Sequence, residues 1–486
     1  MNNKICLVIE GAYPYVAGGV ASWIHQIITK LNEFDFYLIV LLASEEDSKK
    51  VKYKLPENVK GIYHIFLQKK PEKPLFLPDK LIGADLFKKF IENATYANFV
   101  ELIQFLNKAK NRRDISVAFF YAKESFELIE FLYKTLNTDV PFLNFYRAIL
   151  SLTMNFSNIL TANPEIGGVI HTISTGFAGL LASILKISNP KVKLLLTEHG
   201  IYTNERDIEI SFGIWKPDKD SANYLPKAGL ELLKELWRNT FLFLSETCYL
   251  TCDKIITLHE QNRQIEIDQG APNEKIMIIR NGIDLEQYKF RHRKAVSNPP
   301  VVGFLGRIVK IKDIKTLIRA AKIVVQKMEY VKFKIAGPFD EDPDYFEECK
   351  SLVKILLLDN SIEFLGPVNA VEFLNEIDLL VLTSISEGQP LVIAEAASCG
   401  IPAIATDVGG CYEMLYGCDN DKLGQSGIIA EKGNAEDIAK GILTLIHNDS
   451  LYSKCSEVGR ARVEKFYNEE TLIESYRKIY SEALKN

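Results

Sequence analysis

The stretch DLLVLTSISEGQPLVIAEAASCGIPAIATD, residues 378–407, predicts a strand, a loop, a helix and a second strand in direct succession. Its first apolar run ends near Ser384, Pro390 suits the first position of the helix, and Gly400 suits the residue after its end. A strand, a helix and a strand in this order are typical of a parallel sheet covered by helices. The stretch therefore predicts an α/β fold.

The same alternation of short apolar runs and helix-like segments extends along most of the chain. The apolar runs include KICLVIE at residues 4–10, FYLIVLL at 36–42, VVGFLGR at 301–307 and VKFKIAG at 331–337. A single hydrophobic core stops growing at roughly 250–300 residues. Because the chain has 486 residues, we expect two domains, each built on a parallel sheet.

A polar stretch that ends in two prolines, LEQYKFRHRKAVSNPP at residues 285–300, predicts the boundary between these domains. We expect an N-terminal α/β domain at residues 1–284 and a C-terminal α/β domain at residues 285–467. Residues 71–158 are rich in Phe, Tyr, Leu and Lys and predict a helical insertion in the first domain. Residues 468–486 predict a helix that packs back on the first domain.

The composition favours small-molecule chemistry. The net charge of −5 and the 25% of charged residues do not indicate the excess of positive charge expected of a protein that binds nucleic acid or a membrane surface. The N-terminal residues lack a basic region followed by a long apolar stretch, and no apolar run reaches about 18 residues, so we expect a cytoplasmic protein. The eight cysteines include no C-x-x-C pair, and Cys248 and Cys252 lack a second ligand pair, which favours free thiols over disulfides or a metal site.

Two glutamates lie in the opening stretch, one just before its helix and one within it. Glu387 lies in the loop at the carboxyl end of a strand, where open α/β sheets bind ligands. Glu395 follows inside the helix, so that one carboxylate can reach one end of a ligand while the other grips a different part, such as ribose hydroxyls. The amides at the helix start suit phosphate or sugar hydroxyls; they belong to Gly388, Gln389, Pro390 and Leu391. The alternative is a glutamate that complements the helix dipole and a second one on the surface.

Two cations follow the strand-like run that begins the second domain. Arg307 ends VVGFLGR, and Lys312 stands five residues later, just before a helical run. An arginine fork and a lysine point charge that converge at a strand end suit a diphosphate. Lys310 and Lys315 keep the alternative of a solvated basic loop open.

Two adjacent glycines, Gly18 and Gly19, lie between the first apolar run and the amphipathic segment VASWIHQIITKL. A strand, a glycine-rich turn and a helix in this order direct backbone N–H groups and the positive helix end toward an anion or a close-packed ligand. An ordinary tight turn is the alternative.

Together, the Glu-x7-Glu spacing, the FLGR and lysine pattern and the glycine pair resemble the retaining glycosyltransferases of family four, which have the GT-B fold. Four blocks are more narrowly similar to the PelF branch of that family, which acts in the cytoplasm in the synthesis of the Pel exopolysaccharide of biofilms. These blocks are GAYPYVAGGVASWIHQ at 11–26, HTISTGFAGLLA at 171–182, LLTEHGIYTNERDIEI at 195–210 and IRNGID at 279–284. The resemblance covers nearly the whole chain. It implies two facing Rossmann-like domains, of which the C-terminal one mainly holds a nucleotide sugar.

The resemblance also implies a role for single residues. Arg307 and Lys312 would stabilise the leaving diphosphate, and Glu387 would contact the transferred sugar. Glu395 would hold the ribose, and His199 would contact a sugar hydroxyl through its carbonyl or ring. The family transfers the sugar with retention of configuration at its anomeric carbon. These residue types are compatible with two routes to retention, an internal return on one face or a covalent intermediate.

The donor implied by the resemblance is a UDP-sugar, with glucose or an N-acetylhexosamine as the sugar and with no metal or other cofactor. The base is expected to contact the backbone near Gly337 and from Gly366 to Val368. Gly18 and Gly19 are expected to form a loop that closes over the donor phosphates and the acceptor. The family usually has glycine after the phosphate-binding lysine, whereas Asp313 stands there in this chain. Lys310 therefore remains an alternative to Lys312.

The expected acceptor is a growing polysaccharide. Similarity to PelF implies work at the inner face of a membrane. Because the sequence offers neither a spanning segment nor a polybasic run, we expect inner-membrane Pel synthesis proteins to recruit the chain, and we expect no nucleic-acid partner.

Three other interpretations remain. The acidic run DEDPDY at residues 340–345 could be the Asp-x-Asp metal site of the other major glycosyltransferase fold, or a solvated loop after a strand. A sugar-nucleotide epimerase or a phosphorylase would share the GT-B fold, although no pyridoxal phosphate lysine motif is evident. A two-domain protein that binds a UDP-sugar without catalysis is the third.

Overall fold

The computed structural model describes residues 3–16, 18–72, 81, 83–108, 117–118, 120–136, 140–164, 166–211, 227–291, 295–418 and 421–485. The chain divides into two compact units. The first comprises Met1–Thr257, Arg263–Ile278 and Tyr476–Asn486, and the second comprises Leu258–Asn262 and Ile279–Ser475. The predicted boundary at 284/285 thus lies six residues beyond the division at 278/279.

The first unit is built on a parallel sheet that has seven strands in the described residues, in the order β3-β2-β1-β4-β5-β6-β7. The inner strand β1 (Lys4–Glu10) is an apolar run that is buried along its length apart from its two end residues, as expected for a strand covered on both faces. The strands are β1 (Lys4–Glu10), β2 (Asp35–Leu42), β3 (Val59–Phe66), β4 (Val169–Thr172), β5 (Lys193–Glu198), β6 (Lys254–Thr257) and β7 (Ile276–Ile278).

Helices surround this sheet. The helix α1 buries an apolar stripe that includes Trp23, Ile24, Ile27 and Ile28, because these positions recur at helical spacing. The helices of this unit are α1 (Gly19–Lys30), α2 (Ala84–Glu92), α3 (Tyr96–Lys108), α5 (Lys123–Leu136), α6 (Phe142–Thr161), α7 (Phe177–Ser188), α8 (Tyr202–Ser211) and α9 (Lys227–Thr251), with the short turns η1 (Glu45–Lys49) and η2 (Asn273–Lys275). Four of them, α2 to α6, occupy the segment in which we predicted a helical insertion; its residues 73–80, 82, 109–116, 119 and 137–139 lie outside the described part.

Two helices belong to both units. The helix α10 (Glu260–Asp268) begins in the second unit and ends in the first, and α18 (Glu469–Lys485) does the same. The C-terminal part of α18 is anchored within the first unit by a buried chain of hydrogen bonds. The Tyr480 hydroxyl bonds His171 Nδ1 (2.7 Å), His171 Nε2 bonds Thr197 Oγ1 (2.8 Å), and the Tyr476 hydroxyl bonds the same threonine (2.8 Å).

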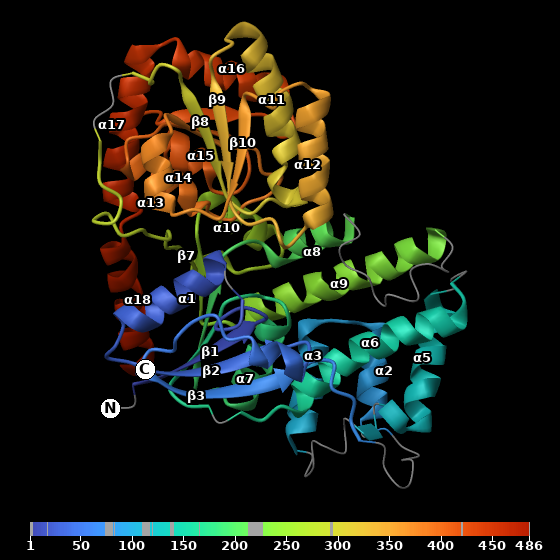
Figure 1. Cartoon of the computed structure of the whole chain (residues 1–486). Coiled ribbons are helices and arrows are strands. Elements are labelled where there is room, and N and C mark those ends of the chain that lie inside the picture. Colours follow the sequence, from blue (N-terminus) through green and yellow to red (C-terminus); the bar gives the residue numbers. More distant parts are fainter. Residues whose placement is uncertain are drawn as a thin grey trace. The chain divides into compact units, whose positions relative to one another are not determined.

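The second unit is built on a parallel sheet of six strands in the described residues, in the order β10-β9-β8-β11-β12-β13. The strands are β8 (Val301–Leu305), β9 (Lys332–Ala336), β10 (Ile362–Gly366), β11 (Leu379–Leu382), β12 (Ala403–Thr406) and β13 (Gly427–Ala430). The helical elements are η3 (Lys310–Lys312), α11 (Ile314–Lys327), α12 (Pro343–Ile355), α13 (Ala370–Glu376), α14 (Leu391–Ser398), α15 (Cys411–Tyr416), α16 (Ala435–Ile446) and α17 (Asp449–Phe466). Figure 1 labels most of these elements.

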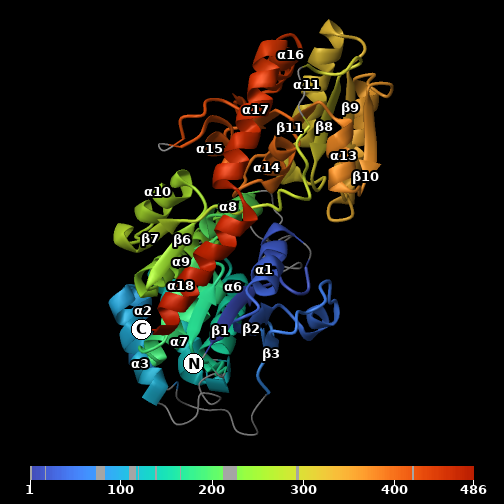
Figure 2. The same ribbon diagram turned by 90° about the vertical axis from the view of Figure 1, so that its left-hand side faces the viewer.

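Helices cover both faces of this second sheet (Figures 1 and 2). The helix α11 packs beside α12 and α16, and α14 packs against α17. The two parallel sheets with their helical layers confirm the predicted α/β class. In the part of the chain that the structure describes, no helix combines the length and the apolar character that a bilayer span requires.

Both sheets reverse their strand order next to their first strand. In the second unit, β9 and β10 lie on one side of β8, and β11 to β13 lie on the other. Ligands of open α/β sheets bind at the carboxyl ends of the strands where the order reverses. The loops that follow β8 and β11 are therefore the expected edge of a ligand site.

Candidate active site

Two predicted site residues meet at this reversal point. Lys312 follows β8 and Glu387 follows β11, and these strands pair directly with each other. The Lys312 ammonium forms an ion pair with Glu387 Oε1, and the Ser384 hydroxyl donates to the same oxygen at 2.5 Å. The lysine and glutamate side chains are only 17% and 10% exposed. The structure thus brings together a cation and an anion that the sequence separates by 75 residues.

The backbone around Lys312 is held from two sides. Asp313 has a left-handed conformation (φ 44°), and its side chain accepts hydrogen bonds from Thr316 N (3.3 Å) and Thr316 Oγ1 (2.6 Å), which caps α11. The Thr383 hydroxyl donates to the carbonyl oxygens of Lys312 and Asp313 (3.0 Å each). Aspartate can stand where the family usually has glycine because it tolerates this conformation and caps the helix. Lys312, and not Lys310, bonds Glu387.

A glycine pair that we did not predict as part of the site supports the Glu387 loop. Gly409 has φ 52°, and a Cβ atom there would lie 2.0 Å from the Glu387 carbonyl oxygen. The amide of Gly410 donates to the Gly388 carbonyl at 2.7 Å. The signal in the sequence is the pair of glycines just after the strand in ATDVGG. A side chain at position 409 would push the loop away from the site.

The residues after Glu387 have different surroundings. The Gln389 side chain is buried and pairs with Asn281 twice, accepting from its N–H and donating to its carbonyl (2.9 Å each). Its amide group therefore holds the IRNGID turn. Pro390, which we predicted at the first helical position, is the residue before α14 and has no N–H to donate. The helix begins at Leu391 without a side-chain cap, so the ligand contacts predicted for this backbone stay a prediction.

Glu395 lies inside α14, in a different environment from Glu387. Burial raises the pKa of the Glu395 carboxyl, and a hydrogen bond from Tyr288 opposes that rise. Tyr288 is a partner that spacing in the sequence could not indicate.

Arg307 makes a different contact from Lys312. Its Nη1 donates to both carboxylate oxygens of Glu341, at 2.7 Å and 2.5 Å. The two side chains are 50% and 56% exposed. Glu341 belongs to the acidic run that we weighed as a metal site, and Asp342 of the same run caps α12 by accepting from Tyr345 N (3.3 Å). Among the described residues, no group of three or more potential ligands has the arrangement of a metal site.

The carboxyl ends of β9 and β10 form the predicted base-binding edge. Gly337 has φ 139°, and a Cβ atom there would lie 1.9 Å from the Gly306 carbonyl oxygen, so only glycine fits. Phe339 was missed by the sequence reasoning; its ring is stacked on Phe346 with centroids 4.3 Å apart, and the residue is 38% exposed. Val368, two residues after the end of β10, is equally exposed at 38%. The edge therefore offers apolar surface, and its backbone is braced by a hydrogen bond from the Gly337 amide to the Gly366 carbonyl (2.8 Å).

The remaining predicted residues lie in the first unit. Gly18 has an extended backbone (φ 168°) that any residue adopts, and a Cβ atom on Gly18 or Gly19 would meet nothing within 4 Å. Neither glycine is therefore required by the packing of the described residues. Gly19 starts α1, which has no side-chain cap. The space left open is compatible with the predicted ligand contact, which stays a prediction.

His199 lies directly after β5, close to α1. Its ring is 4.4 Å from the Trp23 ring, in an edge-on arrangement. Burial lowers the pKa of His199 to about 3, so the imidazole is neutral near pH 7. His199 Nε2 and Trp23 Nε1 are buried without a hydrogen-bond partner in the described part of the chain. Unpaired donors or acceptors of this kind are rare and are typical of places where a ligand or water binds.

The loop that carries His199 is fixed by Glu198. This buried carboxylate accepts hydrogen bonds from the Tyr249 hydroxyl (2.7 Å), the Tyr202 amide (3.1 Å) and the Thr175 hydroxyl (3.2 Å). Burial raises the pKa of Glu198. The three bonds connect β5 to α9, to the start of α8 and to the segment between β4 and α7.

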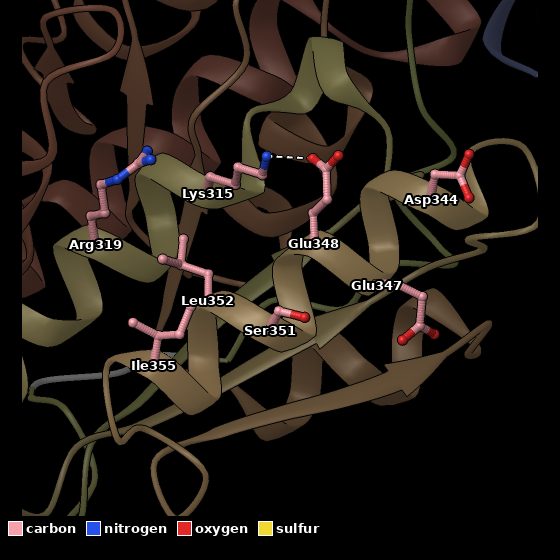
Figure 3. A pocket seen from close by; sticks show the side chains of 8 residues that line it. All are labelled: Lys315, Arg319, Asp344, Glu347, Glu348, Ser351, Leu352 and Ile355. Atoms are coloured by element: carbon pink, nitrogen blue, oxygen red, sulfur yellow. Dashed lines mark hydrogen bonds and ion pairs between the residues drawn. The ribbon is translucent and has the colours of Figure 1, made fainter.

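A depression of about 510 Å³ lies elsewhere in the second unit, between α11 and α12 (Figure 3). Its lining contains none of the predicted site residues, and its Lys315 ammonium pairs with Glu348 at 2.5 Å. We therefore place the candidate site at the carboxyl edge of the sheet and not in this depression.

Two family models match the chain. Residues 3–274 match the model described as a domain of unknown function (DUF3492), and residues 286–462 match glycosyl transferases group 1. The first match covers more than half of the chain.

Several curated relatives share moderate sequence identity. The capsular polysaccharide biosynthesis glycosyltransferase CapM of Staphylococcus aureus is 28% identical over 50% of this chain and 66% of the relative. The N-acetyl-alpha-D-glucosaminyl L-malate synthase of Bacillus anthracis is 26% identical over 67% of this chain and 76% of the relative. An uncharacterized glycosyltransferase of Haemophilus influenzae is 28% identical over 47% of this chain and 61% of the relative. The chain thus spans less than two thirds of the length of some of these proteins.

Solved structures share the fold over nearly the full length. Sucrose-phosphate synthase from Thermosynechococcus elongatus has a TM-score of 0.60 at 15% identity and covers 99% of this chain and 98% of its own. Anabaena HepE in complex with UDP and glucose has a TM-score of 0.59 at 16% identity and covers 99% of each chain. The likeness confirms the predicted GT-B architecture of two Rossmann-like domains.

Proposed function

This chain belongs to the DUF3492 family, joined here to a glycosyl transferases group 1 domain, and on that premise we propose that it is a retaining glycosyltransferase. It transfers a hexose, such as glucose, or an N-acetylhexosamine from a UDP-sugar to a growing exopolysaccharide. The observation that carries the proposal is the meeting of Lys312, Glu387 and Ser384 where the strand order of the second sheet reverses.

The geometry supports a division of roles. When the bond between sugar and diphosphate breaks, negative charge develops on the leaving phosphate and positive charge on the sugar ring. Lys312 and Arg307 stabilise the phosphate, and Glu387 faces the ring. Glu395 holds the ribose. Because these cations neutralise the diphosphate, no metal is needed.

We further propose that the acceptor is the Pel polysaccharide or a related exopolysaccharide, and that membrane proteins recruit the chain to the inner membrane from the cytoplasm. Four PelF-like sequence blocks support this proposal. CapM, a relative, is named for capsular polysaccharide biosynthesis.

Titration calorimetry with UDP, GDP and ADP, in the presence and absence of EDTA, tests the donor assignment. UDP is expected to bind most tightly, and chelation is expected to leave its affinity unchanged. Arg307→Ala is expected to weaken UDP binding by about 1.5–3 kcal/mol, the usual contribution of a charge-assisted contact. Loss of binding on chelation, or equal affinity of Arg307→Ala, would contradict these roles.

A second prediction concerns the base. Phe339→Ala is expected to weaken UDP binding by about 1–2 kcal/mol, because stacking of a base on an aromatic ring contributes about 1–3 kcal/mol. Phe339→Tyr should retain most of the affinity. Tyr330→Ala is the matched control. Tyr330 is an aromatic residue that is 74% exposed and lies just before the start of β9, whereas Phe339 lies after its end. If both alanine variants bind UDP like the unsubstituted chain, the base does not stack on Phe339.

The two remaining alternatives give different products. An epimerase would change the configuration of the sugar nucleotide without an acceptor, and a binding protein would bind it without turnover. Analysis of the donor after incubation with and without polysaccharide separates these cases.

A further inference from the structure

Both cations of the proposed diphosphate site already have a carboxylate partner. Lys312 pairs with Glu387, and Arg307 pairs with Glu341 through both carboxylate oxygens. The two ion pairs leave no net charge on these four side chains. A diphosphate binds well only where positive charge exceeds negative charge, so at least one carboxylate must give up its cation.

The two carboxylates differ in how firmly they are held. Glu387 is 10% exposed and also accepts the Ser384 hydrogen bond. Glu341 is 56% exposed, and its partner Arg307 is 50% exposed. Exposed ion pairs contribute little to stability because solvent screens them. Glu341 is therefore the carboxylate that can be displaced at small cost.

The backbone of the Glu341 loop is fixed on both sides. The Ile308 amide donates to the Pro338 carbonyl at 2.8 Å, and Asp342 caps α12. Displacement of Glu341 thus requires only a new side-chain rotamer, which exposed residues reach in picoseconds to nanoseconds. The loop itself does not have to refold.

We propose that Glu341 is an internal counter-ion that holds the Arg307 guanidinium until the diphosphate of the donor replaces it. The inference rests on the proposed function of this site. A carboxylate, like a phosphate group, offers two negatively charged oxygens to arginine. Both Glu341 oxygens accept from Arg307 Nη1, so Glu341 keeps the guanidinium placed beside β8. Donor affinity is then the outcome of a competition between diphosphate and Glu341.

The test is the UDP affinity of Glu341→Gln, measured by titration calorimetry at low ionic strength. This substitution removes the competing charge and the repulsion of the diphosphate, so UDP is expected to bind about threefold to tenfold more tightly. Added salt should reduce the gain. In the Arg307→Ala background, Glu341→Gln should bring a much smaller gain, because the competition has been removed.

The matched control is Glu348→Gln. Glu348 pairs with Lys315 at 2.5 Å in the same domain and is 53% exposed, but it lies in the depression between α11 and α12 (Figure 3). Its substitution changes the net charge equally and should alter UDP affinity by less than twofold.

Unchanged or weaker UDP binding by Glu341→Gln would overturn the inference, and so would an equal gain in both glutamine variants. If the unsubstituted chain fails to bind UDP, the proposed donor is wrong and the inference falls with it. These outcomes separate a failure of the counter-ion role from a failure of the proposed function.

Discussion

Replacing Glu387 with glutamine is expected to lower donor turnover roughly 100- to 1000-fold while UDP affinity stays within a few-fold of its original value. Glutamine keeps the size of the side chain and an oxygen that can accept from Ser384, but it removes the negative charge facing the sugar ring. Because that ring becomes positive only as the bond breaks, the loss falls on the transition state. Turnover of the sugar nucleotide and calorimetry with UDP provide the two measurements.

Glu395→Gln, inside the helix α14 that follows the Glu387 loop, is the matched comparison. Ribose hydroxyls change little during transfer, so this substitution should weaken donor binding similarly in the ground and transition states. Near-normal turnover of Glu387→Gln would show that Glu387 only complements the start of α14. Equal effects of the two substitutions on turnover would also contradict the proposed division of roles.

Lys312→Ala is expected to weaken UDP binding about tenfold to a hundredfold and to lower the free energy of unfolding by about 2–3 kcal/mol. The affinity falls because a charge-assisted contact to phosphate is lost. Stability falls because Glu387, only 10% exposed, would keep its charge without a counter-ion. Denaturant unfolding and UDP calorimetry measure the two effects separately.

The double variant Lys312→Ala with Glu387→Gln supplies the internal control. It should recover most of the lost stability, because no unpaired charge remains, but it should not recover UDP affinity. Lys310→Ala is the comparison for the neighbouring lysine and should leave stability unchanged. If Lys312→Ala unfolds like the unsubstituted chain and binds UDP normally, the basic loop is only a solvated surface.

Local patterns in the sequence were sufficient for the fold class, and they indicated which edge of the sheet to examine for a site. Lys312 and Glu387 each follow an apolar run, and residues after parallel strands gather at one edge of a sheet. Their ion pair is consistent with that rule, although we did not predict from the sequence that these two residues pair. We predicted Pro390 as the first residue of the helix, but it is the capping residue just before α14. The fixed φ of proline suits both positions.

Other parts of the site depend on contacts between distant segments, which spacing alone does not reveal. Gln389 was predicted to contact the ligand through its backbone amide, which stays a prediction; spacing gave no sign that its side chain pairs with Asn281, 108 residues away. Glu341 and Arg307 come from loops after neighbouring strands, and their pairing depends on side-chain length and direction. Gly409 matters only because the Glu387 carbonyl packs against it.

The cysteine thiols give the chain built-in reporters of local opening. Among the cysteines, all but Cys418 are buried, so thiol reagents can reach the others only when the surrounding structure opens. Cys6 lies on β1 of the first unit, and Cys411 lies in the second unit, near enough to Glu387 and Lys312 for their charges to influence its pKa. The labelling rates of these two thiols would give a separate opening free energy for each domain, without any introduced probe. Protection of Cys411 alone by a bound nucleotide would locate the stabilised region in the second domain.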